Sequence, residues 1–180
     1  MIGYPRPILG FSAHSGTGKT TLLKRLLPIL RDAGVRVAVI KHAHHRFEID
    51  QPGKDSYELR KAGATQMLVA SSRRMALVTE FDREREPGLR EMLAALDPER
   101  FDMVLVEGFK REAFPKIELH RPSLGRPLLC LHDPHIIAIA SDGELPECPA
   151  RVMKLDINDI IQLSEFIKDF ILNPRRQRDS

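Results

Sequence analysis

Residues 13–20 read Ala-His-Ser-Gly-Thr-Gly-Lys-Thr, and this stretch decides the fold that we expect. It follows an apolar run at 7–12 and opens a helical pattern, so a strand, a glycine-rich turn and a helix succeed one another. That order is the setting of a phosphate-binding P-loop, with the consensus G-x-x-x-x-G-K-[ST]. Ala13 stands where the consensus has glycine, but the core at 15–20 is intact. The stretch therefore predicts phosphate binding, with a glycine-rich turn that holds no ligand as the alternative.

The chemistry of the motif assigns roles to its residues. Glycines let the backbone curl so that N–H groups point at phosphate oxygens, and the helix adds its positive N-terminal end. Lys19 would reach the β- and γ-phosphates, and the Thr20 hydroxyl would bind Mg²⁺. The residues predicted to contact the nucleotide are Ser15, Gly16, Thr17, Gly18, Lys19, Thr20 and Thr21.

Length, charge and composition exclude several classes of protein. The chain has 180 residues, a net charge of +3 and no apolar run long enough for a membrane span. No tryptophan is present, and no aromatic residues interleave with basic ones as they do on a surface that stacks nucleic-acid bases. The start of the chain does not resemble a secretory signal. We therefore expect a cytoplasmic protein that binds neither nucleic acid nor a membrane.

Strand and helix patterns alternate along the chain, which is typical of an α/β fold. With the P-loop, they predict a three-layer P-loop NTPase-like fold with a mostly parallel central sheet. We expect one nucleotide-binding domain over 1–172 and a basic, disordered tail over 173–180. Strands are expected at 7–12, 35–41, 66–70, 75–79, 102–107, 116–120, 128–131 and 136–140, and helices at 19–33, 56–62, 87–96 and 157–172. The runs at 66–70 and 75–79 form either a hairpin or adjacent strands.

Glu107 ends a near-continuous apolar strand, which indicates a strand buried on both faces. The carboxyl ends of such strands face the ligand in open α/β sheets. A carboxylate there can hold Mg²⁺ or polarise the attacking water, so Lys19 and Glu107 are the candidate catalytic residues. The alternative is that Glu107 only precedes a turn.

The segment 41–56 is rich in histidine, lysine and aspartate. It begins where the second strand ends, so its first residues lie on the P-loop edge of the sheet. Its charges suit an anionic ligand with a divalent cation, and the alternatives are a transition-metal site at the histidines or a plain solvated loop. The candidate anion-contacting residues are Lys41, His42, His44, His45, Lys54 and Asp55, with Asp50 as a candidate Mg²⁺ ligand.

Asp142 follows a late apolar strand in the sequence Ala-Ser-Asp-Gly at 140–143. A carboxylate at that place can accept hydrogen bonds from N1 and the 2-amino group of guanine, a donor pair that adenine lacks. An ordinary Asp-Gly turn is an equal alternative.

These segments together resemble the MobB family of molybdopterin-guanine dinucleotide biosynthesis adaptor proteins. The likeness extends from about residue 8 to residue 172, and its most specific part is the His-rich loop followed by Gly-Lys-Asp-Ser. The segments that carry it are Ser15–Leu23, Lys41–His45, Asp50–Ser56, Ala62–Ala64, Val106–Lys110 and Ala138–Asp142.

The resemblance implies a homodimer that binds GTP and hydrolyses it slowly, if at all. It implies assistance to the guanylyltransferase partner, MobA, which attaches GMP to molybdenum-bound molybdopterin. Carried onto this chain, Thr20 and Glu107 would hold Mg²⁺ with Asp50, and the loop at 41–55 would face the nucleotide or the pterin.

Two other functions fit parts of the same pattern. An ATP-dependent ligase or small-molecule kinase resembling dethiobiotin synthetase would use Thr20, Asp50 and Glu107 around Mg²⁺. A metallochaperone GTPase would load a transition metal through His42, His44 and His45.

Overall fold

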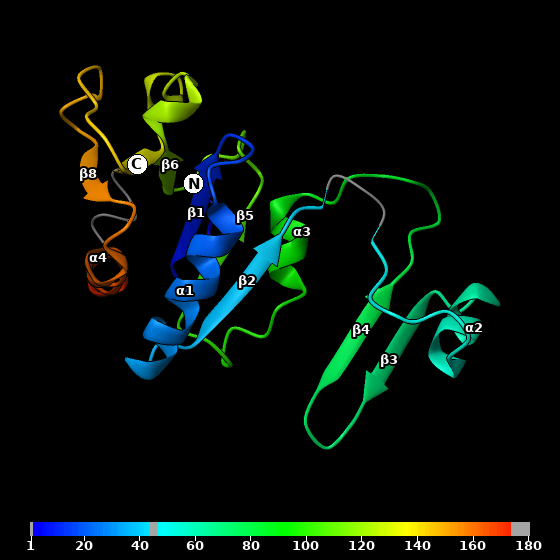
Figure 1. Cartoon of the computed structure of the whole chain (residues 1–180). Helices are drawn as coiled ribbons and strands as arrows, with labels where there is room; N and C mark the ends of the chain where they lie inside the picture. The colour runs from blue at the N-terminus through cyan, green and yellow to red at the C-terminus, as the bar shows by residue number, and fades with distance from the viewer. Residues whose placement is uncertain (1, 44–46, 174–180) are drawn as a thin grey trace. The chain divides into compact units, whose positions relative to one another are not determined.

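The computed structural model describes residues 2–43 and 47–173. They pack as two compact units, a sheet unit drawn from residues 1–42 and 89–180 and a hairpin unit drawn from residues 43–88 (Figure 1). The single domain expected over 1–172 stays a prediction, and the predicted tail from 174 onward lies outside the described residues.

The sheet unit is built on six strands in the order β2-β5-β1-β6-β7-β8. Every pairing in this sheet is parallel, so the expected α/β class is confirmed. The carboxyl ends of all six strands therefore meet at one edge. The strands are β1 (Ile8–Ala13), β2 (Val37–Lys41), β5 (Met103–Glu107), β6 (Lys116–His120), β7 (Ile136–Ser141) and β8 (Met153–Asp156).

Helices cover both faces of the sheet. Successive residues of a strand point to opposite sides, so an apolar strand offers side chains for packing on each face. Met103 and Leu105 of β5 belong to a core shared with α1 (Lys19–Asp32) and α4 (Ile160–Leu172). Val104 and Val106 belong to a second core, shared with α3 (Leu89–Ala94). The sheet thus lies between two helical layers, as the sequence pattern predicted.

The hairpin unit consists of α2 (Asp55–Lys61) and the antiparallel strands β3 (Gln66–Ala70) and β4 (Met75–Thr79). The hairpin, rather than two adjacent strands of the main sheet, is the alternative that forms. Arg60 of α2 is buried and pairs with Glu48 at 2.6 Å and with Glu80. This guanidinium joins the loop before α2 to the residue that follows β4.

Two element predictions were wrong. Residues 128–131 do not form a strand, because the Glu118 carboxylate accepts hydrogen bonds from the amides of Leu129 and Cys130, each at 2.8 Å, and holds a short 3-10 helix, Leu129–Leu131. The last helix begins at Ile160 rather than 157, where Asp159 caps it by accepting from the Gln162 amide at 2.9 Å. The strand β8 was not predicted at all.

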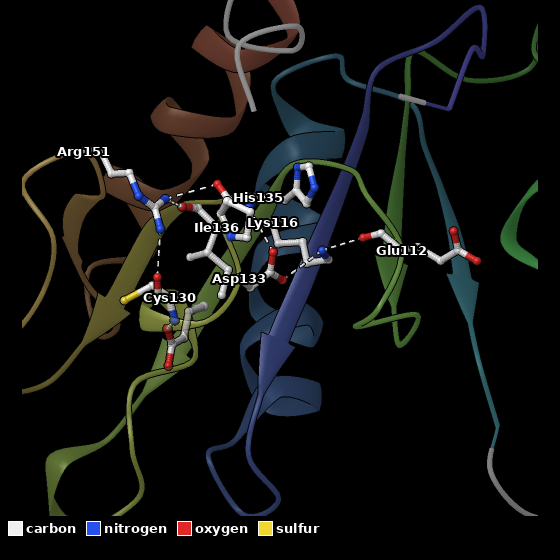
Figure 2. Close-up of polar contacts among 9 residues, drawn as sticks. Glu112, Lys116, Cys130, Asp133, His135, Ile136 and Arg151 are labelled. Carbon is white, nitrogen blue, oxygen red and sulfur yellow. Dashed lines mark hydrogen bonds and ion pairs between the residues drawn. The ribbon is translucent and has the colours of Figure 1, made fainter.

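A buried lysine connects loops at the end of the sheet opposite the carboxyl edge. The Lys116 side chain, 1% exposed, donates to the Glu112 carbonyl at 2.7 Å and pairs with Asp133 at 3.0 Å (Figure 2). Close by, Arg151 donates to the carbonyls of Cys130 and Ile136 (Figure 2). These cations connect the loops that enter β6, β7 and β8.

Replacing Lys116 with methionine is expected to lower the free energy of unfolding by about 3 kcal/mol, because it leaves the partly buried Asp133 carboxylate without its cation. Methionine keeps most of the apolar stem, so lost packing contributes little. Urea denaturation would measure the change. Lys24→Met, at an exposed position on α1, is the matched control and should change stability by less than about 0.5 kcal/mol.

Candidate functional site

The P-loop connects β1 to α1 at the carboxyl edge of the sheet. Gly16 and Gly18 have φ of 83° and 94°, the left-handed region that favours glycine. Gly18 also caps α1, and no side chain caps the helix. The first-turn amides of α1 therefore have no acceptor within the helix and are oriented to bind an anion. Thr17 braces the loop by donating from Oγ1 to the His14 carbonyl at 2.8 Å.

The conformation of Ala13 explains why alanine can replace the first glycine of the P-loop consensus. It is the last residue of β1 and is buried. Among the non-glycine residues of the described ranges only Phe109 has a positive φ, so Ala13 is in an ordinary strand conformation. No glycine is needed at this position, and the turn depends on the two glycines that follow.

Lys19 and Glu107 lie together beside the P-loop. Glu107 ends β5, which pairs with β1 in a register that sets Phe11 opposite Glu107. The Lys19 Nζ is 3.3 Å from Glu107 Oε1, and the two side chains are 22% and 17% exposed. The structure thus brings the two candidate catalytic residues into contact, while their chemical roles stay predictions.

A tight turn after β5 returns a second lysine to the P-loop. Gly108 has a φ of 109° and Phe109 a φ of 52°, and the ring of His42 stacks on Phe109 at 4.6 Å. A Cβ at Gly108 would lie 2.6 Å from the His42 Cβ, so only glycine fits. Lys110 then donates from Nζ to the Ala13 carbonyl at 2.7 Å.

Lys110 is held there at an electrostatic cost. Burial, and after it the charge of Lys19, lowers the pKa of Lys110 below its ordinary value. The ammonium groups of Lys19 and Lys110 thus lie at the P-loop with the Glu107 carboxylate. The two positive charges favour a polyanionic ligand. We assigned no role to Lys110 from the sequence, and the signal that could have found it is a cation three residues after the strand-ending Glu107.

Asp142 lies on the other side of the P-loop, one residue past β7. Its carboxylate pairs with Arg121, which follows β6 and also donates from Nε to the Thr17 carbonyl at 3.0 Å. No local motif surrounds Arg121, so no role was predicted for it from the sequence. A hollow opens next to Asp142, lined by Ser141, Gly143, Glu144, Leu145, Pro146, Lys154, Leu155 and Asp156.

The P-loop and the charged residues around it lie within a region that matches a known family. The family model for molybdopterin guanine dinucleotide synthesis protein B, MobB, matches residues 8–142. The chain belongs to the MobB family.

Two MobB relatives are similar over nearly their whole length. The molybdopterin-guanine dinucleotide biosynthesis adapter protein of Escherichia coli strain K12 is 49% identical over 166 residues, 92% of this chain and 93% of the relative. The protein of the same name from Haemophilus influenzae is 41% identical over 165 residues, 92% of this chain and 89% of the relative. A crystal structure of molybdopterin-guanine biosynthesis protein B has a TM-score of 0.72 at 26% identity, covering 92% of this chain and 99% of that one.

The other predicted residues of this MobB chain are divided between the two units. Lys41 ends β2 opposite Glu107, and the His42 amide donates to the Glu107 carbonyl at 2.8 Å, so both belong to the P-loop edge. His44 and His45 lie outside the described residues.

Three predicted residues belong to the hairpin unit. Asp50 accepts from the Ser56 hydroxyl at 2.8 Å. Lys54 is the N-cap of α2 and Asp55 is its first residue, and both line a hollow with β3. The proposed Mg²⁺ role of Asp50, and the anion-contacting roles of the segment, stay predictions.

Other chemistry has less support in the part of the MobB chain that the structure describes. Within residues 2–43 and 47–173 no group of three or more His, Cys, Asp or Glu side chains could hold a metal ion. Burial raises the pKa of the Cys130 thiol to about 12, so it stays protonated and is a poor nucleophile. No helix in the same ranges is long and apolar enough to cross a bilayer.

Proposed function

We propose that this protein is a cytoplasmic GTP-binding adaptor of molybdenum cofactor biosynthesis, which assists the guanylyltransferase MobA in converting molybdenum-molybdopterin to its guanine dinucleotide form. The carrying observation is the P-loop of a MobB-family chain with Lys19 and Glu107 in contact at 3.3 Å. Hydrolysis is expected to be slow, because no water-orienting glutamine or arginine finger can be assigned from the sequence.

The residues at the carboxyl edge fit a magnesium nucleotide. Thr20 lies in the first turn of α1, and Glu107 supplies a carboxylate beside Lys19. The hydroxyl and the carboxylate are oxygen donors of the kind that Mg²⁺ prefers. Asp50 is a third proposed ligand. When bound, Mg²⁺ would neutralise charge on the β- and γ-phosphates.

Asp142 is our proposed guanine contact. The hollow beside it lies at the carboxyl ends of β7 and β8, on the same edge as the P-loop. Ligands of open α/β sheets bind at that edge, so the base and the phosphates of one nucleotide can lie on two neighbouring loops.

Two further assignments complete the proposal. Lys41, His42, His44, His45, Lys54 and Asp55 form a segment whose cations suit the anionic pterin. The protein is a homodimer, and the hairpin supports this because Leu68, Met75 and Leu77 are exposed on one face of two paired strands.

Lys110→Gln is expected to weaken GTP binding about tenfold, because the phosphates lose one charge-assisted partner. The lowered pKa of Lys110 also predicts that the GTP affinity of the parent protein depends on pH. Protonated Lys110 attracts the phosphates, so GTP affinity should fall as pH rises through this pKa, below the range of an ordinary lysine. Affinities from pH 7 to pH 10 should show a flatter profile for the variant, and equal profiles would contradict this role.

The decisive experiment is a calorimetric titration of Mg·GTP and Mg·ATP, with and without MobA. We expect GTP to bind more tightly than ATP, and MobA to change the GTP affinity. Binding of ATP without binding of GTP would overturn the proposal.

Turnover of a small substrate by the purified protein alone would favour the ligase or kinase alternative. Stoichiometric Ni²⁺ or Zn²⁺ binding, lost in His42→Ala and in His44→Ala, would favour the metallochaperone alternative.

A further inference from the structure

The segment 121–127, which follows β6, is fastened to both loops that would contact a nucleotide. At its start, Arg121 contacts the P-loop and Asp142. At its end, the Pro127 carbonyl lies 3.1 Å from His14 Nε2. Between them, Pro122 packs against Gly143, where an added Cβ would lie 3.1 Å from the Pro122 Cγ.

Arg121 is the polar centre of this arrangement. Its Nε donates to the Thr17 carbonyl at 3.0 Å while its Nη1 pairs with Asp142 Oδ2. A Cβ built on Gly18 would lie 3.9 Å from its Nη2, so the guanidinium lies alongside the P-loop backbone. One rigid, planar side chain therefore joins the phosphate loop to the carboxylate beside the hollow.

The environment of the Arg121–Asp142 ion pair suits the orientation of the Asp142 carboxylate. The Arg121 and Asp142 side chains are 33% and 27% exposed, so solvent screens their charges less than on an open surface. A carboxylate offers about four acceptor sites. The Arg121 bond therefore orients Asp142 and leaves acceptor capacity for the two donors on the guanine edge.

We infer that Arg121 is a positioning residue for nucleotide selection, which holds Asp142 at a set distance from the P-loop so that guanine is read when the phosphates are bound. This inference rests on the proposed GTP binding. Without Arg121, the P-loop still binds phosphates, but the carboxylate is free to rotate away from the base. The loss should therefore fall on GTP rather than on ATP.

The test compares Mg·GTP and Mg·ATP affinities of the parent protein with those of Arg121→Ala, Arg121→Lys and Arg126→Ala. We expect Arg121→Ala to lower GTP affinity about tenfold and ATP affinity less than about threefold. Arg121→Lys should be intermediate, because an ammonium cannot span both acceptors. Arg126→Ala, an exposed residue of the same segment, should match the parent.

A second comparison isolates the link to Asp142. In an Asp142→Asn background, adding Arg121→Ala should change the ratio of GTP to ATP affinity by less than about twofold, because the coupled partner is already altered. Thermal unfolding of each variant checks that it is folded.

Equal losses of GTP and ATP affinity in Arg121→Ala, or none, would overturn the inference and leave the proposed function standing. A parent protein that binds ATP and not GTP would overturn the proposed function, and the inference with it.

Discussion

Lys19→Ala is expected to lower GTP affinity about 100-fold while the protein stays folded. The substitution removes the ammonium that would contact the β- and γ-phosphates, and it also removes the partner of Glu107, 3.3 Å away. Calorimetric titration with Mg·GTP would measure the loss, and circular dichroism would report the fold.

Lys24→Ala is the matched control for this variant. Lys24 lies on the exposed face of the same helix, α1, and should leave GTP affinity within about twofold of the parent value. The P-loop assignment would be wrong if Lys19→Ala bound GTP as tightly as the parent.

Asp142→Asn is expected to change the preferred base from guanine to xanthine. Guanine offers N1–H and an amino group to a carboxylate, whereas xanthine carries a carbonyl in place of the amino group. The side-chain amide introduced by this substitution would donate to that carbonyl and accept from N1–H. We expect GTP affinity to fall about 100-fold in the variant, because a mismatched site leaves buried polar groups unpaired. The variant should then bind xanthosine triphosphate more tightly than GTP. Calorimetric titration with the two magnesium nucleotides would measure both changes.

Asp156→Asn separates this role from a general effect of charge. Asp156 lines the hollow that opens next to Asp142, and its Oδ1 accepts from the Asn158 amide, a bond that asparagine can keep. This control should retain the preference for GTP. If Asp156→Asn preferred xanthine and Asp142→Asn still preferred guanine, Asp156 would be the guanine contact and our assignment of Asp142 would be wrong.

The confirmed predictions concern elements whose signals are local. The glycine-rich turn, the leucine face of α1 and the apolar run of β5 each depend on residues within about two turns or one strand. One of the wrong predictions concerns a segment whose backbone is decided by a group outside it. Residues 128–131 have a strand-like composition, but the Glu118 carboxylate binds two of their amides and bends them into a turn.

The candidate site divides in the same manner. Lys19 and Glu107 could be chosen from the sequence, because a P-loop and a strand-ending carboxylate are recognisable in isolation. Lys110 and Arg121 were not assigned, since their contacts to Ala13 and Thr17 cross 97 and 104 residues of chain. Only the parallel order of β5, β1, β6 and β7 brings those residues to one edge.

By itself, the sequence determined the glycine-rich P-loop turn and the family of this protein. A left-handed glycine turn before a helix depends on adjacent residues, so the short stretch at 13–20 suffices to specify it. The tertiary structure decided which charged groups surround the P-loop. Lys110 reaches it through the turn at Gly108 and Phe109, and Arg121 reaches it because β6 ends beside β1. Their positions follow from strand order and long-range packing, which no local pattern encodes.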